Sequence, residues 1–291
     1  MCPNARFWLV GLFAGLLVAC GGGGSSVAGS STAVQPSAVQ TPTTPPPAPP
    51  EAPGPTVTTA TQLDLLLVYS TGLSSYYADV PLRLQHLVNT ANTTLADSGV
   101  DMVFNIAGFL AVDYPDDLDV DQALNDITRG EHPSLENVAS MRDQQQADLV
   151  VLLRPYANDG YCGVAWVGGY GTSGDFSSPA EADYAYSVVA ADCSDHTLLH
   201  EVGHNLGLVH SRQEDPTGGT FAWSAGYGVD QSFVTIMASQ SAFNAPRMPL
   251  LSSPALTCAG VACGVPASDA QAGADAVASL NAVKEQVAAY R

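Results

Sequence analysis

The fold is decided by one stretch, His200-Glu201-Val202-Gly203-His204-Asn205-Leu206-Gly207-Leu208-Val209-His210, which has the pattern H-E-x-x-H-x-x-G-x-x-H. On a helix, side chains four residues apart project from the same face, so His200 and His204 can bind one metal ion. Gly207 has no Cβ and can take the left-handed conformation that ends a helix. The chain can then turn and bring His210 back to the same ion.

Three neutral imidazole nitrogens and one open position filled by water describe a catalytic zinc site rather than a closed structural one. Glu201 directly follows the first histidine and can reach the water as a general base. The alternative is three ordinary core or surface histidines, which the fixed spacing of the pattern disfavours. We therefore expect one catalytic Zn²⁺ bound by His200, His204 and His210.

The pattern resembles the long zinc motif of the metzincin metallopeptidases, in which a turn bearing methionine follows. Met237, in Thr235-Ile236-Met237-Ala238-Ser239, is available for that turn. The resemblance implies that Met237 lies beneath the zinc as a hydrophobic floor and ligates nothing. An ordinary core methionine would pack in nearly the same way.

Within the metzincins, the chain is most similar to the bacterial reprolysin-like group, which is related to the adamalysins. The matching stretches, besides the zinc motif, are LDLLLVY at 63–69, ADLVVLL at 147–153, YCGVAW at 161–166 and Ser252-Ser253-Pro254. Ser211 is a departure, because adamalysins usually carry aspartate after the third histidine. The resemblance covers most of the chain from about residue 60 onward.

The resemblance implies a zincin fold of the α/β (α+β) class, with a twisted, mostly parallel sheet, an active-site helix and a Met-turn. An antiparallel edge strand would border the cleft and pair with extended substrate. The candidates for that strand are Val164, Ala165, Trp166 and Val167. Strand addition lets backbone groups bind any peptide while pockets choose side chains.

Apolar periodicity supports the same class independently. Buried strands are expected at 63–68 and 149–153, further strands at 100–112 and 186–190, and helices at 81–97, 119–129, 134–145 and 276–290. Alternation of strand and helix predicts right-handed crossovers. Ser194 or Asp195 is expected to cap the zinc helix. Three aromatic residues either wall a specificity pocket or cover the lower core: Phe221, Trp223 and Tyr227.

The N-terminal segment is interpreted as an export signal. Residues 1–19 contain an apolar run that is too short to span a bilayer comfortably. Leu17-Val18-Ala19-Cys20 resembles the lipobox of bacterial lipoproteins, so Cys20 would carry acyl chains; a plain secretory signal is the alternative. We expect a cell-surface or outer-membrane address, or secretion if the lipobox is not used. Residues 20–56, rich in Pro, Gly, Ser and Thr, predict a disordered tether before a metallopeptidase domain at 57–291.

Cysteine usage agrees with export. Apart from Cys2 and Cys20, the six cysteines leave Cys162, Cys193, Cys258 and Cys263, an even number that suggests two disulfides. Cys258 and Cys263 bracket a short loop, and Cys162 would then pair with Cys193. Free thiols are disfavoured outside the cytosol. Zinc binding by these cysteines is also disfavoured, because the sequence contains no Cys-x-x-Cys pair.

The formal charge of −19, from 9 basic and 28 acidic residues, argues against nucleic acid as a partner. The acidic run Asp113, Asp116, Asp117, Asp119 and Asp121 could suggest Ca²⁺, but it lacks the spacing of an EF-hand, and a solvated loop is favoured. We expect a monomer that contacts membrane only through its lipid.

Together these features predict a zinc endopeptidase that hydrolyses proteins or peptides, with Glu201 as general base. A rival is a surface-anchored binding or adhesion module with a metzincin fold and little turnover. The intact Glu201 argues against the rival, because an inactive protein need not keep its base. A zinc hydrolase of non-peptide substrates is a third possibility, since fold and motif do not name the substrate.

Overall fold

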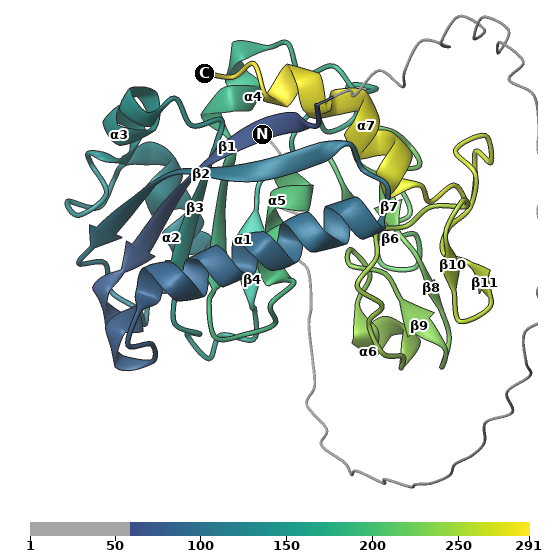
Figure 1. Cartoon of the computed structure of the whole chain (residues 1–291), viewed down its shortest axis with the longest axis horizontal. Helices are drawn as coiled ribbons and strands as arrows, with labels where there is room; N and C mark the ends of the chain where they lie inside the picture. Colours follow the sequence, from purple (N-terminus) through teal and green to yellow (C-terminus); the bar gives the residue numbers. More distant parts are fainter. Residues whose placement is uncertain (1–58) are drawn as a thin grey trace, which may run out of the picture. The chain divides into compact units, whose positions relative to one another are not determined.

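A five-stranded sheet organises the computed structural model, which describes residues 59–291 (Figure 1). Its strands, in the spatial order β2-β1-β3-β5-β4, are β2 (Met102–Val112), β1 (Thr61–Ser70), β3 (Leu149–Arg154), β5 (Tyr186–Ala190) and β4 (Gly163–Ala165). The first four are parallel, and β4 runs antiparallel to β5. The predicted α/β class, with a mostly parallel sheet and an antiparallel edge strand, is confirmed.

Helices cover both faces of this sheet. On one face Leu63, Leu65 and Leu67 of β1 share a core cluster with side chains of α1 (Val80–Asp97), α5 (Thr197–Asn205) and α7 (Ala276–Val287). On the other face Leu66 and Val68 pack with α2 (Val120–Arg129) and α3 (Val138–Gln145). Side chains alternate across a strand, so a strand buried on both faces has a continuous apolar run. This is why β1 could be predicted from its sequence.

Shorter elements complete the described chain. They are η1 (Thr71–Ser75), α4 (Pro179–Asp183), β6 (Val209–Ser211), β7 (Ala225–Gly226), β8 (Gly228–Val229), β9 (Phe233–Val234), α6 (Gln240–Phe243), β10 (Thr257–Cys258) and β11 (Val261–Ala262). Figure 1 places β6 to β11 together beyond the end of α1, beside the main sheet. Within residues 59–291, no helix is both long and apolar enough to cross a membrane.

Two local predictions need correction. The helix expected at 134–145 begins only at Val138, because a tight turn in which Leu135 N–H donates to His132 O (2.8 Å) precedes it. Neither Ser194 nor Asp195 caps the zinc helix: the N-cap is His196, without a side-chain cap. The Asp195 carboxylate instead pairs with Arg83 at 2.6 Å, a contact with a distant helix that local sequence does not reveal.

Some predictions fall on residues that the structure does not describe. These are the signal peptide at 1–19, the lipid on Cys20 and the tether at 20–56, all of which lie outside residues 59–291.

Candidate metal centre

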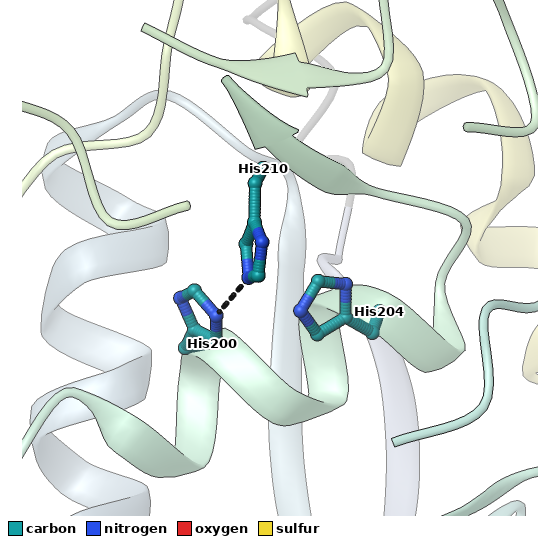
Figure 2. A group of neighbouring side chains, drawn as sticks. All are labelled: His200, His204 and His210. Carbon is teal, nitrogen blue, oxygen red and sulfur yellow. Dashed lines mark hydrogen bonds between the residues drawn. The ribbon is translucent and has the colours of Figure 1, made fainter. Parts of the chain in front are cut away.

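The three predicted histidines converge on one point. Helix α5 presents His200 and His204 from one face and ends at Asn205. Gly207, two residues further on, has a φ of 84°, the left-handed conformation that glycine favours after a helix end. The chain turns there and enters β6, which carries His210 back over the helix (Figure 2). One nitrogen of each ring lies within 4.8 Å of the others. In residues 59–291, these three histidines form the cluster of metal-binding side chains whose ligand atoms lie close enough together to hold one ion.

The spacing and chemistry of these nitrogens fit zinc. The Nε2 atoms of His200 and His210 are 3.0 Å apart. Two nitrogens bound tetrahedrally to one zinc ion at its usual bond length would stand roughly 3.3 Å apart. The opposite nitrogens are fixed: Nδ1 of His200 lies 2.9 Å from Ile236 O, and Nδ1 of His204 lies 2.8 Å from Leu208 O. Carbonyls only accept hydrogen bonds, so both Nδ1 atoms carry protons and both Nε2 lone pairs face the site.

Burial keeps the rings neutral, which is the form that binds metal. Loss of solvent lowers the pKa of His204 to about 3 and that of His210 to about 4, and it also lowers the pKa of His200. The neighbouring rings lower the pKa values of His200 and His204 further. The donor set is therefore three uncharged imidazoles, as a catalytic zinc requires.

Glu201 lies beside this group without belonging to it. Its side chain is only 4% exposed, and burial raises the pKa of its carboxyl to about 8. A Cβ built on Gly163 of β4 would stand 2.6 Å from Oε1 of Glu201, so the backbone of the edge strand passes directly against the carboxyl. Glu201 thus lies between the histidines and the edge strand.

Met237 supports the zinc helix from below. It is fully buried, and a Cβ on Gly203 would approach its Sδ to 2.9 Å. Gly203 lies between His200 and His204 in the sequence, so its missing side chain is what allows the methionine to pack against the helix. Met237 is therefore a buried residue that packs against the zinc helix at Gly203.

The sequence of the chain matches a metallopeptidase family. The family described as "Metallo-peptidase family M12B Reprolysin-like" matches residues 58–269. The chain belongs to this reprolysin-like metallopeptidase family. A relative from Pseudomonas aeruginosa named "Peptidyl-Asp metalloendopeptidase" is 32% identical over 250 residues, which cover 79% of this chain and 40% of the relative. A relative of the same name from Stenotrophomonas maltophilia is 26% identical, with 80% of this chain and 54% of the relative covered.

This metallopeptidase chain therefore spans only about half the length of the curated relatives it matches. A solved structure described as "Structure of a chaperone-substrate complex" shares the fold, with a TM-score of 0.60 and 24% identity. The match covers 80% of this chain and 35% of that one. We take from it the fold alone.

Ser211, which follows the third histidine and departs from the adamalysin pattern, is hydrogen-bonded to Glu214, a residue that was not predicted from the sequence. Ser211 donates to Oε2 of Glu214 through its hydroxyl (2.6 Å) and its backbone N–H (3.3 Å). The backbone N–H of Ser239 donates to the same oxygen at 3.1 Å. Glu214 therefore ties the residue beside His210 to the turn that carries Met237. The S-x-x-E spacing of Ser211 and Glu214, a capping-box signature, was the available signal.

The edge strand of the metallopeptidase is shorter than predicted. Strand β4 covers Gly163–Ala165, so Val164 and Ala165 lie on it while Trp166 and Val167 follow it. The chain leaves the sheet after Ala165 because Asn205, at the end of α5, donates from Nδ2 to Trp166 O (3.0 Å) and to Tyr186 O (2.9 Å). This amide ties the edge strand, β5 and the zinc helix together.

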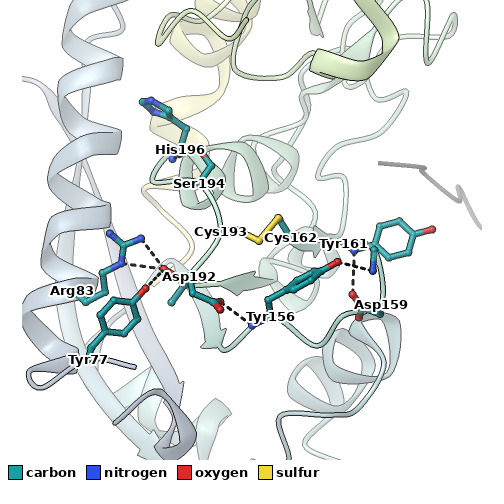
Figure 3. Close-up of a disulfide and its surroundings, with 12 residues drawn as sticks. Tyr77, Arg83, Tyr156, Asp159, Tyr161, Cys162, Asp192, Cys193, Ser194 and His196 are labelled. Carbon is teal, nitrogen blue, oxygen red and sulfur yellow. Dashed lines mark hydrogen bonds between the residues drawn. A yellow bond between two sulfur atoms is a disulfide. The ribbon is translucent and has the colours of Figure 1, made fainter. Parts of the chain in front are cut away.

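Both disulfides join the cysteine pairs expected from the sequence, Cys162–Cys193 and Cys258–Cys263. Figure 3 shows the first of them linking the entry of β4 to the segment that leads into α5. Cys162 O also accepts from Ala190 N–H at 2.7 Å, at the end of β5. The covalent link therefore fixes the edge strand relative to the zinc helix.

The remaining sequence candidates lie elsewhere. Phe221 stacks on Trp223 with ring centroids 4.7 Å apart and packs against the main core, and Tyr227 packs beside Cys258 and Cys263. These contacts support the interpretation that the aromatic residues cover the core, rather than the alternative that they line a specificity pocket. In the acidic run, Asp119 caps α2 by accepting from Asp121 N–H and Gln122 N–H.

Proposed function

We propose that this protein is a zinc-dependent endopeptidase. The observation that carries the proposal is the convergence of His200, His204 and His210, as neutral rings, beside the buried carboxyl of Glu201. When bound, zinc would polarise the scissile carbonyl and acidify a water molecule. The peptidase relatives and family support protein or peptide substrates.

The residues of the chain itself then have separate tasks. Glu201 takes a proton from the attacking water and passes it to the leaving amine nitrogen. The free side of β4 offers backbone N–H and C=O groups to an extended peptide, because its other side is already paired with β5. Substrate held there would lie against Glu201, since Gly163 brings the strand backbone to the carboxyl.

We also propose cleavage at aspartate, on the strength of the name "Peptidyl-Asp metalloendopeptidase" carried by the relatives. Export rests on the sequence: a lipidated Cys20 would anchor the domain, as a monomer, to the cell surface or outer membrane. Labelled palmitate should enter the wild-type chain but not Cys20→Ser, and equal incorporation in both would contradict the lipobox.

The deciding experiment measures zinc content together with chelator-sensitive cleavage of an unstructured protein such as casein. We expect one zinc per chain, lost with chelator along with activity. His210→Ala should lose the metal, and full zinc occupancy in that variant would contradict the three-ligand site. Tight binding of a partner with no cleavage by the zinc-loaded wild type would favour the adhesion-module rival instead.

A further inference from the structure

The guanidinium of Arg247 forms no ion pair with a carboxylate in residues 59–291. Within residues 59–291, each other arginine and the lysine has a hydrogen bond or ion pair from its side chain: Arg83, Arg129, Arg142, Arg154, Arg212, Lys284 and Arg291. In the same part of the chain, no hydrogen bond or ion pair joins the Arg247 side chain to another residue, and its Nε is buried without a partner. Burying a charge without compensation is costly, so an anion that bound this guanidinium would remove an unfavourable feature of the free protein.

The backbone holds Arg247 next to the metal centre. Val234 N–H donates to Pro246 O (2.9 Å), and Met248 N–H donates to Val234 O (2.7 Å), so the segment around Arg247 is paired with the chain that leads into the Met-turn. Ile236 N–H donates to Leu250 O in the same ladder (2.9 Å). Because Ile236 O in turn holds His200, Arg247 lies on a backbone segment directly adjoining the one that orients a metal ligand.

The charge of Arg247 reaches the site. It acts on the carboxyl of Glu201 and on the rings of His200 and His210. No nitrogen of Arg247 comes within ion-pair distance of a carboxylate in residues 59–291, and Oε2 of Glu214 already serves Ser211 and Ser239. The side chain is half-buried rather than sealed, so a ligand can reach it.

We propose that Arg247 determines specificity by binding the side-chain carboxylate of a substrate aspartate next to the scissile bond. A guanidinium offers a fork of donors that matches a carboxylate with two parallel hydrogen bonds. The chain as a whole carries a charge of −19 and repels acidic peptides, so their capture requires a local positive group. Of the basic residues in the described chain, Arg247 combines nearness to Glu201 with a free guanidinium. This inference rests on the proposed endopeptidase function.

The test uses the full-length, zinc-loaded protein and quenched peptides that differ only by Asp, Asn or Glu at one central position. Wild type should cleave the Asp peptide with a kcat/KM about 30-fold to 1,000-fold above that of the Asn peptide, as expected for a desolvated charge pair. Arg247→Gln should bring the ratio close to one, and Arg247→Lys should retain part of it. The matched control is Arg129→Gln, which removes an equal charge from the exposed end of α2 on the opposite face of the sheet and should leave the ratio intact.

A binding measurement removes dependence on turnover. In a Glu201→Gln background, fluorescence anisotropy should show tighter binding of the Asp than of the Asn peptide, and Arg247→Gln should abolish that difference while zinc content stays constant. An unchanged Asp-to-Asn ratio in a folded Arg247→Gln or Arg247→Lys protein would overturn this inference and leave the endopeptidase standing. Wild type that cleaves without any acidic preference would do the same. Absence of chelator-sensitive cleavage by wild type would overturn the proposed function and this inference together.

Discussion

Replacing Glu201 by Gln separates catalysis from metal binding. The pocket accepts glutamine, because the carboxyl lies against Gly163, which has no side chain, and the two side chains have the same size. Zinc should remain bound, since His200, His204 and the carbonyls that orient them are untouched. Removal of a general base lowers kcat/KM by roughly 100-fold to 10,000-fold, or about 3 to 5 kcal/mol of transition-state stabilisation.

The same change should not destabilise the fold. Burial raises the pKa of Glu201 from 4.5 to about 8. Because the folded-state pKa is the higher one, metal-free protein loses stability as pH rises from about 4.5 to 8, by up to about 5 kcal/mol. With chelator present, Glu201→Gln should therefore unfold at a higher temperature than wild type at pH 8 and at a similar one at pH 4.

Two results would refute this reasoning. A folded, zinc-loaded Glu201→Gln protein that cleaves casein at the wild-type rate would show that Glu201 is not the base. Loss of zinc from the variant, measured by metal analysis after dialysis, would show that the carboxylate helps to hold the metal.

Three further changes test the supports of the site and the core. Glu214→Ala removes the acceptor shared by Ser211 and Ser239 and should weaken zinc affinity about 10-fold to 100-fold in chelator competition, whereas the exposed Glu136→Ala should not. Gly203→Ala places a Cβ 2.9 Å from Met237 Sδ and should destabilise the fold by about 1 to 3 kcal/mol in thermal unfolding; Gly108→Ala, where the nearest atom is 3.4 Å away on Gln145, should be close to neutral. Burial raises the pKa of Asp148 from 3.8 to about 6, so its ionisation costs stability as pH rises through this range; metal-free Asp148→Asn should gain up to about 3 kcal/mol over wild type at pH 7 and little at pH 4. An equal gain at both pH values would contradict that assignment.

The sequence predicted the parts of the fold that depend on local pattern. β1, α1 and β3 lie within a few residues of their expected bounds, because apolar period and run length reflect burial directly. The convergence of the three histidines could be predicted for the same reason: helix geometry relates His200 to His204, and one glycine turn returns His210. The family resemblance implied only an antiparallel edge strand, and the spatial order of the strands, with β4 outside β5, was not predicted because local pattern does not encode it.

Contacts between distant segments were not predictable in this way. His196 rather than Asp195 is the N-cap of α5, because the Asp195 carboxylate is paired with Arg83 of another helix. The edge strand ends at Ala165 because the carbonyl of Trp166 accepts a hydrogen bond from the side-chain amide of Asn205. In each case a residue with the right local propensity is bound by a partner that the local sequence does not name.

Glu214 and Arg247 show which features a motif search overlooks at a metal site. A metal ligand must place one nitrogen at one point, so its spacing in the sequence is strict. A residue that supports a ligand needs only to place a hydrogen-bond acceptor near its donors. Glu214, three residues after Ser211, accepts in this way from Ser211 and Ser239. The sequence position of a residue that determines specificity is constrained even less, because any segment that lies next to the site can contribute it. Arg247 therefore appears only when each cation of the described chain is matched with its partner and one beside the metal centre is left over.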